Sequence, residues 1–385
     1  PPLLLIHGEQ DRGVPLEISL AMRDRCRELG LPVECLTIPG CGHYVQHDAR
    51  GQTLDAIEGR VVIEDGMITA VEQASVHADD IVVPAFINAH THLGDSIAKE
   101  AGLDLSLEEL VAPPDGLKHR LLEAAQPETR IDAMRRSLRY METGGVGACY
   151  DFREGGIDGV LELRSAADGL AIDAVAFGRG DEGVIAHADG YGASGAADAQ
   201  FDAQRRAARR QGKPFAIHAG ETDAGDINPA LDLDPDLVVH MVHAEELHLE
   251  RLADGRTPVV CCPRSNLVTD VGLPPIESMD EMTTVALGTD NVMSNSPSIL
   301  REMEFTAKLF DLDPTSVLAM ATVNPAAILD RPDGVIEAGR PARLVVFDGG
   351  SDNLAYAVDP ASAIVRRASR TDIVDVIFAP TEPEG

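Results

Sequence analysis

Two histidines separated by one residue end an apolar run near position 90. In the text PAFINAHTHLGDS, His90 and His92 occupy positions i and i+2 of a predicted strand. Successive side chains of a strand point to opposite faces, so these two imidazoles point to the same side. Two imidazoles on one face can share one metal ion, and the pair is the first candidate for metal chemistry.

Further polar residues end apolar runs in the second half of the chain. They are His218 in KPFAIHAGE, His240 and His243 in LVVHMVH, and Asp290 at the end of VALGTD. In a barrel of parallel strands the C-terminal strand ends converge on one mouth, so residues far apart in sequence meet there. If these groups ended strands by chance, each would need a separate hydrogen-bond partner. We therefore expect them to share one site.

The elements that must position these residues fill the middle of the sequence. Residues 84–332 alternate strand-like and helix-like segments, and this length suits a (β/α)8 TIM barrel of about 250 residues. Eight strands are predicted, at 82–90, 146–151, 172–177, 184–187, 214–218, 237–240, 259–262 and 284–289. Helices are predicted at 128–141, 197–210, 245–253 and 298–310, and a loop rich in Gly and Ala at 189–199.

Two flanking segments, residues 52–83 and 333–385, are predicted to form one small β-sandwich. IEGRVVIEDGMITAVEQ carries alternating apolar positions broken at Asp65 and Gly66, which is the pattern of a hairpin. GVIEAGRPARLVVFDGG and AIVRRASRTDIVDVIFAP are strand-rich as well. The predicted fold class is therefore α/β, a barrel with a sandwich built from both flanks and an N-terminal α/β fragment at 1–51.

The N-terminal fragment has its own pattern, with predicted strands at 3–7 and 33–38 and a helix at 16–29. LLLIHGEQDRGVP and LTIPGCGHYV resemble the C-terminal end of an α/β-hydrolase, in which Asp11 and His43 would match the acid and the histidine of a catalytic triad. The sequence holds no G-x-S-x-G elbow, and in that family the serine precedes the acid. A serine esterase would therefore need an upstream domain, and we expect no activity from this segment.

The motifs H-x-H, H-A-G-E, H-x-x-H, C-P-R-S-N and G-T-D-N, in this order, resemble the amidohydrolase superfamily in its branch of adenosine and cytosine deaminases and triazine chlorohydrolases. The resemblance covers residues 55–380. It implies four metal ligands, His90, His92, His218 and Asp290, and two catalytic residues, Glu221 and His240. It also implies one divalent ion, zinc in preference to iron. Lys213 precedes the fifth strand rather than ending the fourth, so a bridging carboxylated lysine is not indicated.

The residue types agree with this chemistry. Neutral imidazoles and a carboxylate bind zinc-like ions and leave a position for water, whose pKa then falls towards about 7. Asp290 can accept the proton of that water, and Glu221 can deliver a proton to the leaving nitrogen. His240 can hold the hydroxide and the developing oxyanion. We predict hydrolysis of a C–N bond, first of all deamination of a nitrogen heterocycle or a nucleoside-like small molecule.

Other strand ends supply candidates for contact with the substrate. The predicted contacts are Asp151, Arg153, Glu154, Arg179, Asp189, Arg264 and Asn266. The segment PPDGLKHR, residues 113–120, follows the first strand and could form a lid, with Lys118 and His119 nearby. His248 lies away from the strand ends and is predicted to be a surface residue.

The composition limits the classes of function. With 32 basic and 64 acidic residues the net charge is −32, and four residues are lysine. Dispersed acidity of this kind is typical of halophilic proteins, and it argues against nucleic-acid binding, which needs a basic surface. The six cysteines form no C-x-x-C pair. Without a membrane-length apolar run or a signal segment, we expect a soluble, cytoplasmic protein that acts on a small molecule. Assembly into a homo-oligomer stays open.

Two alternatives remain at this point. The same site fits hydrolysis of an amide or a C–Cl bond, because a fold and its metal ligands are shared across many substrates. A catalytically silent barrel that serves as a scaffold is the second, although the presence of all six polar positions argues against it. Metal analysis separates the scaffold from the enzyme.

Overall fold

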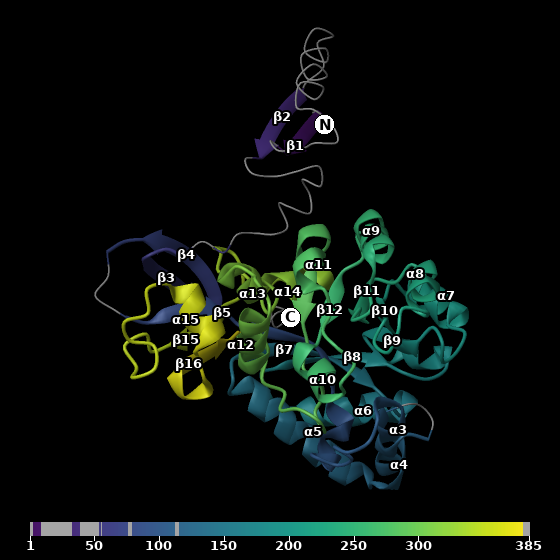
Figure 1. Cartoon of the computed structure of the whole chain (residues 1–385). Helices are drawn as coiled ribbons and strands as arrows, with labels where there is room; N and C mark the ends of the chain where they lie inside the picture. The colour runs from purple at the N-terminus through teal and green to yellow at the C-terminus, as the bar shows by residue number, and fades with distance from the viewer. Residues whose placement is uncertain are drawn as a thin grey trace. The chain divides into compact units, whose positions relative to one another are not determined.

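The computed structural model describes residues 3–8, 33–38, 54, 56–75, 79–111 and 115–379. The chain divides into two compact units, Pro1–Thr53 and Leu54–Gly385 (Figure 1). Among the described residues, no helix has both the length and the apolar character needed to cross a membrane.

The first unit contains two of the elements that the sequence predicts. Strands β1 (Leu3–Gly8) and β2 (Val33–Ile38) pair in parallel, with Leu3 opposite Val33. The helix predicted between them, together with Asp11 and His43, falls outside the described residues.

The second unit is built around a closed ring of parallel strands. Its sheet runs in the order β13-β12-β11-β10-β9-β8-β7-β6-β14, and β14 follows β13 in the chain. Because β14 pairs with β6, with Asp290 opposite Thr91, the sheet closes on itself as the predicted (β/α)8 barrel. The strands are β6 (Phe86–His92), β7 (Val146–Arg153), β8 (Asp173–Gly178), β9 (Gly190–Gly195), β10 (Phe215–Ala219), β11 (Leu237–His240), β12 (Val259–Cys261), β13 (Val285–Leu287) and β14 (Asp290–Asn291).

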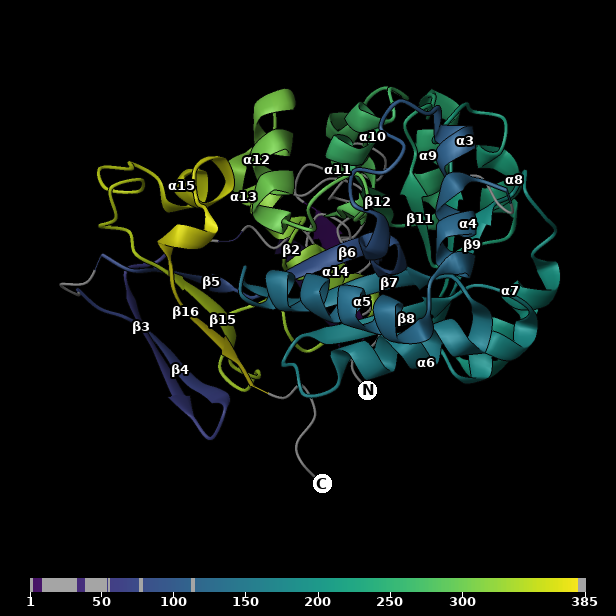
Figure 2. The same cartoon turned by 90° about the horizontal axis from the view of Figure 1, so that it is seen from below.

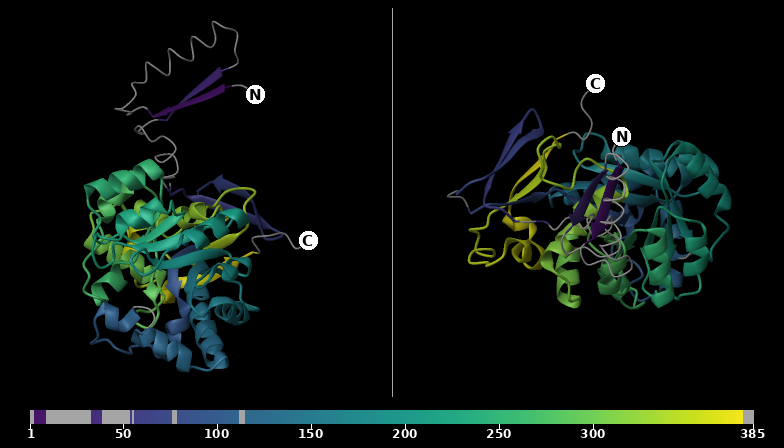
Figure 3. Two further views of the ribbon diagram at one scale, coloured as in Figure 1. Left: turned by 90° about the vertical axis from the view of Figure 1, so that its right-hand side faces the viewer. Right: turned by 90° about the horizontal axis from the view of Figure 1, so that it is seen from above.

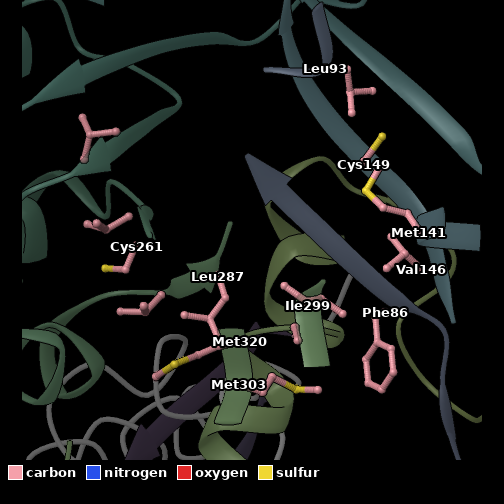
Figure 4. Close-up of a cluster of buried hydrophobic side chains, with 14 of the residues drawn as sticks. Phe86, Leu93, Met141, Val146, Cys149, Cys261, Leu287, Ile299, Met303 and Met320 are labelled. Atoms are coloured by element: carbon pink, nitrogen blue, oxygen red, sulfur yellow. The ribbon is translucent and has the colours of Figure 1, made fainter. Parts of the chain in front are cut away.

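Helices follow the strands and cover the outside of the barrel (Figure 2). Helix α5 shows why: Met134, Leu138 and Met141 are buried along one stripe of it, at helical spacing, and face the strands. Figure 4 shows part of the resulting core, which includes Phe86 of β6 and Met303 of α12. The helices are α3 (Leu107–Val111), α4 (Leu117–Ala124), α5 (Pro127–Glu142), α6 (Gly156–Ala167), α7 (Asp202–Gln211), α8 (Ile227–Asp232), α9 (Glu246–Gly255), α10 (Pro263–Val268), α11 (Ile276–Met282), α12 (Ile299–Leu309), α13 (Pro314–Ala319) and α14 (Val323–Ile328).

One barrel strand lies where the sequence predicts a loop. The strand predicted at 184–187 is wrong, because this apolar run belongs to the 3-10 helix η2 (Glu182–Ala186), and β9 occupies the Gly- and Ala-rich stretch that follows. A Cβ atom at Gly190 would lie 2.8 Å from the ring of Phe177, and one at Gly192 would lie 2.6 Å from the ring of Phe152. These aromatic rings of β7 and β8 thus leave no room for the side chains by which a strand is usually recognised.

Two small sheets lie together beside the barrel (Figure 3). Strands β3 (Gly59–Glu64) and β4 (Met67–Gln73) form the predicted hairpin. The second sheet has the order β16-β15-β5 and joins β5 (Ile81–Pro84) to β15 (Arg343–Phe347) and β16 (Ile373–Phe378). The predicted strand 82–90 is therefore two strands that meet at Ala85, one in each layer. The run AIVRR is also corrected, because it lies largely in helix α15 (Pro360–Arg366).

A buried cluster of charges joins these sheets to the N-terminal ends of the barrel strands. We call Asp173, Arg331, Asp333 and Arg343 the floor cluster. Arg343 is 2% exposed; its Nε lies 3.3 Å from Asp333 Oδ2, and Nη1 donates to the carbonyl of Ala379 at 2.8 Å. Arg331 pairs with Asp333 at 2.8 Å and with Asp173 at 2.6 Å. Each charge in this cluster has an opposite charge beside it.

Candidate metal and acid–base site

The predicted ligands and the predicted catalytic histidine lie at the C-terminal ends of four barrel strands. They are His90 and His92 on β6, His218 on β10, His240 on β11 and Asp290 on β14. Since all these strands are parallel, their C-terminal ends gather at one mouth. All five side chains are buried there.

The three ligand histidines stand close enough to hold one ion. Nitrogens of His90, His92 and His218 lie within 4.8 Å of one another, and so do the ligand atoms of a second set formed by His90, His240 and Asp290. His90 is 0% exposed, yet neither of its nitrogens has a hydrogen-bond partner. Burying an unpartnered imidazole is costly unless another group uses its lone pair. These residues therefore fit a divalent ion held by imidazoles and one carboxylate.

Backbone carbonyls orient two of the imidazoles. His92 Nδ1 lies 3.1 Å from the carbonyl oxygen of Phe152, and His218 Nδ1 lies 2.8 Å from that of Ala193. A carbonyl can only accept, so a hydrogen bond to it places the proton on Nδ1 and leaves the lone pair on Nε2. At His218 we assign this tautomer because the carbonyl, at 2.8 Å, is nearer to Nδ1 than the Arg179 guanidinium, at 3.2 Å. Metal-bound histidines are commonly held in this way by a partner on the other ring nitrogen.

The charge states suit metal binding. Burial lowers the pKa of His90 to about 4 and that of His92 to about 3, and it holds the pKa of His218 well below its ordinary value. These rings are neutral at pH 7, which is the form that binds a metal. Burial alone would raise the pKa of Asp290, but its interaction with His90, whose Nε2 lies 3.3 Å from Oδ1, is the first of those that hold that pKa well below the ordinary value.

Two of these residues adopt a backbone conformation that non-glycine residues rarely occupy. His240 has φ +77° and Asp290 has φ +59°. Left-handed conformations cost energy for such residues and are frequent at functional sites. In this barrel they occur directly where a strand ends, and they turn the two side chains towards the mouth.

Glu221 lies beside the ligand set rather than within it. It follows Gly220, whose φ of +64° turns the chain after β10. Its Oε2 lies 3.4 Å from Nε2 of His240, and its side chain is 19% exposed. Burial raises the pKa of Glu221, so the carboxyl holds a proton more readily than a free glutamate does. A protonated carboxyl at this place can act as a proton donor.

The predicted substrate contacts divide into two groups. Five of them lie at or near the mouth. Glu154 contacts His92 Nδ1 at 3.0 Å, Arg179 contacts His218 Nδ1 at 3.2 Å, and Asn266 Nδ2 lies 3.3 Å from His240 Nδ1. Arg153 and Asp151 lie behind Glu154: Arg153 donates to Glu154 at 3.0 Å and lies 3.5 Å from Asp151.

Two predicted contacts are better explained by the fold. Asp189 directly precedes β9, at the barrel end opposite the histidines; it accepts from the backbone of Ala176 at 2.8 Å and pairs with Arg164. This misplacement follows from the wrong strand at 184–187. Arg264 is buried, and its Nε donates to Glu302 at 2.6 Å. Its guanidinium also donates to the carbonyl of Ser296, so its donors are used within the protein.

Sequence reasoning missed several residues around the site. Lys118 was expected only near a lid, but it is 2% exposed and reaches Glu154 Oε1 at 2.6 Å and Asn291 Oδ1 at 3.1 Å. Ser265 Oγ donates to Asp290 Oδ2 at 2.6 Å. Ser265 and Asn291 belong to the quoted motifs C-P-R-S-N and G-T-D-N, which is the signal that could have found them. His248, expected at the surface, is buried and caps α9.

Comparisons with known proteins agree with this geometry. The model of the amidohydrolase family matches residues 81–379, and that of the prolyl oligopeptidase family matches residues 1–58. Both resemblances inferred from the motifs are thereby confirmed.

Among relatives, a protein of Methanothermobacter thermautotrophicus provisionally named an aminohydrolase is 34% identical over an alignment of 373 positions, which covers 86% of this chain and 95% of that protein. A protein of Haloarcula marismortui named 5-methylthioadenosine/S-adenosylhomocysteine deaminase is 27% identical over an alignment of 354 positions, which covers 77% of this chain and 79% of that protein. Among solved structures, a zinc-bound adenosine deaminase of Xanthomonas campestris has a TM-score of 0.66 at 19% identity, over 98% of this chain and 92% of that one. At this identity the structural similarity shows the fold alone.

Proposed function

The chain belongs to the amidohydrolase family and is a hydrolase of C–N bonds; from this premise we propose that it deaminates an adenine-type nucleoside, with one zinc ion at the barrel mouth. The observation that carries the proposal is the buried set of three histidines and Asp290, with Glu221 directly beside it. The deaminase name of the Haloarcula marismortui relative supports the substrate class. Zinc, in preference to iron, is supported by the zinc-bound structure of the same fold.

In this proposal, His90, His92, His218 and Asp290 hold the ion. A divalent ion there would lower the pKa of a bound water towards about 7 and so supply a nucleophile at neutral pH. The Ser265 hydroxyl occupies Asp290 Oδ2 at 2.6 Å, while Oδ1 lies 3.3 Å from Nε2 of His90. Oδ1 also accepts from Asn291 Nδ2 at 3.0 Å, so both oxygens of Asp290 are held, and the second lone pair of Oδ1 can take a proton from water.

Glu221 and His240 complete the chemistry. Hydrolytic deamination forms a C–O bond from water and breaks the C–N bond; one proton of water leaves with ammonia, and the other remains on the ring nitrogen of the oxo product. The raised pKa of Glu221 suits delivery of a proton to the substrate nitrogen, which makes the amine a better leaving group. His240 lies 3.4 Å from Glu221 and is held by Asn266, so it can stabilise the attacking oxygen.

We retain two of the predicted residues as substrate contacts. Asn266 has a buried Oδ1 without a hydrogen-bond partner, and such an oxygen is available to a donor on the purine. Arg179 lies beside His218, with its side chain 17% exposed at the mouth. Both can orient a heterocycle against the ion.

Ammonia release by the purified, zinc-loaded full chain tests the proposal. We expect activity with adenosine, 5'-deoxyadenosine, 5-methylthioadenosine or S-adenosylhomocysteine, and none with simple amides or chlorotriazines. Glu221→Gln keeps the shape but removes the titratable proton, so turnover should fall by about 100- to 10,000-fold while zinc content stays at one per chain.

The other outcomes contradict specific parts of the proposal. Ammonia from guanine or a pyrimidine alone would contradict the adenine class, and amide or C–Cl hydrolysis without ammonia would replace deamination. A protein that binds no zinc and releases no ammonia would support the alternative function, a catalytically silent scaffold. Full turnover in Glu221→Gln would overturn the role of that residue.

A further inference from the structure

One lysine is buried at the mouth of the barrel in a chain that has four lysines in all. Lys118 is on α4, outside the barrel wall, and its side chain is 2% exposed. Lysine is almost never buried without an opposite charge, because the ammonium loses its hydration. The contacts of this ammonium therefore need an explanation.

The first contact leads to His92. Lys118 Nζ lies 2.6 Å from Glu154 Oε1, and the same oxygen lies 3.0 Å from His92 Nδ1. The other carboxylate oxygen of Glu154 accepts from Arg153 at 3.0 Å. The carboxylate is therefore fixed from both sides, and it can hold the His92 ring with Nε2 turned to the ion.

The second contact leads to Asp290. Lys118 Nζ donates to Asn291 Oδ1 at 3.1 Å, and Asn291 Nδ2 donates to Asp290 Oδ1 at 3.0 Å. The ammonium thus fixes which end of the Asn291 amide faces the carboxylate. Since an amide has one donor end and one acceptor end, flipping it would set oxygen against oxygen at Asp290.

We propose that Lys118 is a positioning residue of the metal centre, which orients two ligands at once, His92 through Glu154 and Asp290 through Asn291. The inference rests on the metal site of the proposed function. Lys118 touches neither ligand itself. With this role for Lys118, Glu154 orients the ligand His92 and does not contact the substrate as the sequence predicted.

Zinc affinity of the full chain tests this role, measured by competition with a chromophoric chelator. Outer partners of metal ligands typically contribute about 10- to 100-fold in affinity, and we expect a loss of this size in Lys118→Met. Glu154→Gln should lose less, because it keeps the shape of the side chain and the carbonyl of Phe152 still accepts from His92 Nδ1. The cobalt-loaded proteins should also differ from wild type in their visible absorption, since the ligand geometry changes.

A matched control separates positioning from stability. Lys213 is also a partly buried lysine, but its ammonium donates to the carbonyls of Ile185 and Ala188, at 2.6 Å each. Lys213→Met should change zinc affinity by less than about twofold. The double variant Lys118→Met with Glu154→Gln removes both charges, so it should recover thermal stability but not zinc affinity.

Three results would overturn the proposal: Lys118→Met that binds zinc as tightly as wild type, an unchanged cobalt spectrum, or a double variant with wild-type affinity. If Lys118→Met does not fold, the affinity and spectrum of the double variant decide. Failure of the proposed function looks different, because then wild type itself binds no zinc.

Discussion

The barrel carries a cluster of charged and polar side chains at each end, and the two clusters differ in how their groups are partnered. At the floor, Arg343 lies between Asp333 and the carbonyl of Ala379, and Arg331 bridges two aspartates. At the mouth, His90 has two unpartnered nitrogens, and Asp95 and Asn266 each have an oxygen without a hydrogen bond. Asp173 has 36% of its side chain exposed, but Arg343 and Asp333 are as buried as the groups at the mouth, so burial alone does not distinguish the two regions.

The difference lies in what each cluster leaves unsatisfied. Buried polar groups normally find partners, and an orphaned group is retained only where something else uses it. The floor cluster joins β15 of the small sheet to the start of β8. Each of its charges has an opposite charge beside it, and Nε of Arg343 is its one buried nitrogen without a hydrogen bond among the described residues, so we assign the cluster to stability. The mouth keeps free lone pairs and a carboxyl with a raised pKa, Glu221, so we assign it to chemistry.

The largest effect that this comparison predicts is at the mouth. His218→Ala removes one of the few ligands, so we expect loss of the zinc ion and ammonia release at background level. The fold should remain, because the floor cluster and the barrel core are untouched. Elemental analysis, ammonia release and circular dichroism of the same preparation check this. Retained zinc with normal turnover would show that the mouth is not the site.

At the floor we expect a smaller effect, a loss of stability without a loss of zinc binding or turnover. Arg343→Met leaves Asp333 with one cation and removes the donor to Ala379, and breaking a buried pair typically costs about 3–5 kcal/mol. We expect the lower part of that range, since Arg331 stays in place, with zinc affinity and turnover close to wild type. Chemical denaturation of the metal-free protein measures the loss.

Arg60→Met is the control for this variant, because Arg60 pairs with Glu72 at the surface, with 67% of its side chain exposed. An exposed pair contributes at most about 1 kcal/mol. If Arg343→Met lost zinc affinity while its stability matched that of Arg60→Met, the division between floor and mouth would be wrong.

The sequence predicts those parts of the molecule whose pattern is local. An apolar run that ends in a polar residue places β11 at residues 237–240 and His240 at its end. Prediction from the sequence fails where the residues that decide a structure lie far away in the chain. The glycines of β9 are required by Phe152 on β7 and Phe177 on β8, and the burial of Lys118 depends on Glu154, directly after β7, and on Asn291 of β14. Pattern reading has no access to such long-range contacts.

The smallest predicted effect concerns salt, and it tests whether both clusters are closed to solvent. The net charge of −32 implies strong repulsion among surface carboxylates. Molar salt screens charges beyond about 3 Å, so the free energy of unfolding of wild type should rise markedly between dilute buffer and molar KCl.

The buried pair Arg343–Asp333 of the floor cluster should be screened much less, because ions do not reach it. Wild type and Arg343→Met should therefore gain stability together, and the difference between them should change by less than about 0.5 kcal/mol between the two salt conditions. Denaturant unfolding of both proteins at each salt concentration gives this value. A difference that shrinks towards zero in molar KCl would mean that solvent reaches Arg343. The floor would then be an ordinary surface network, and the mouth alone would hold buried charge.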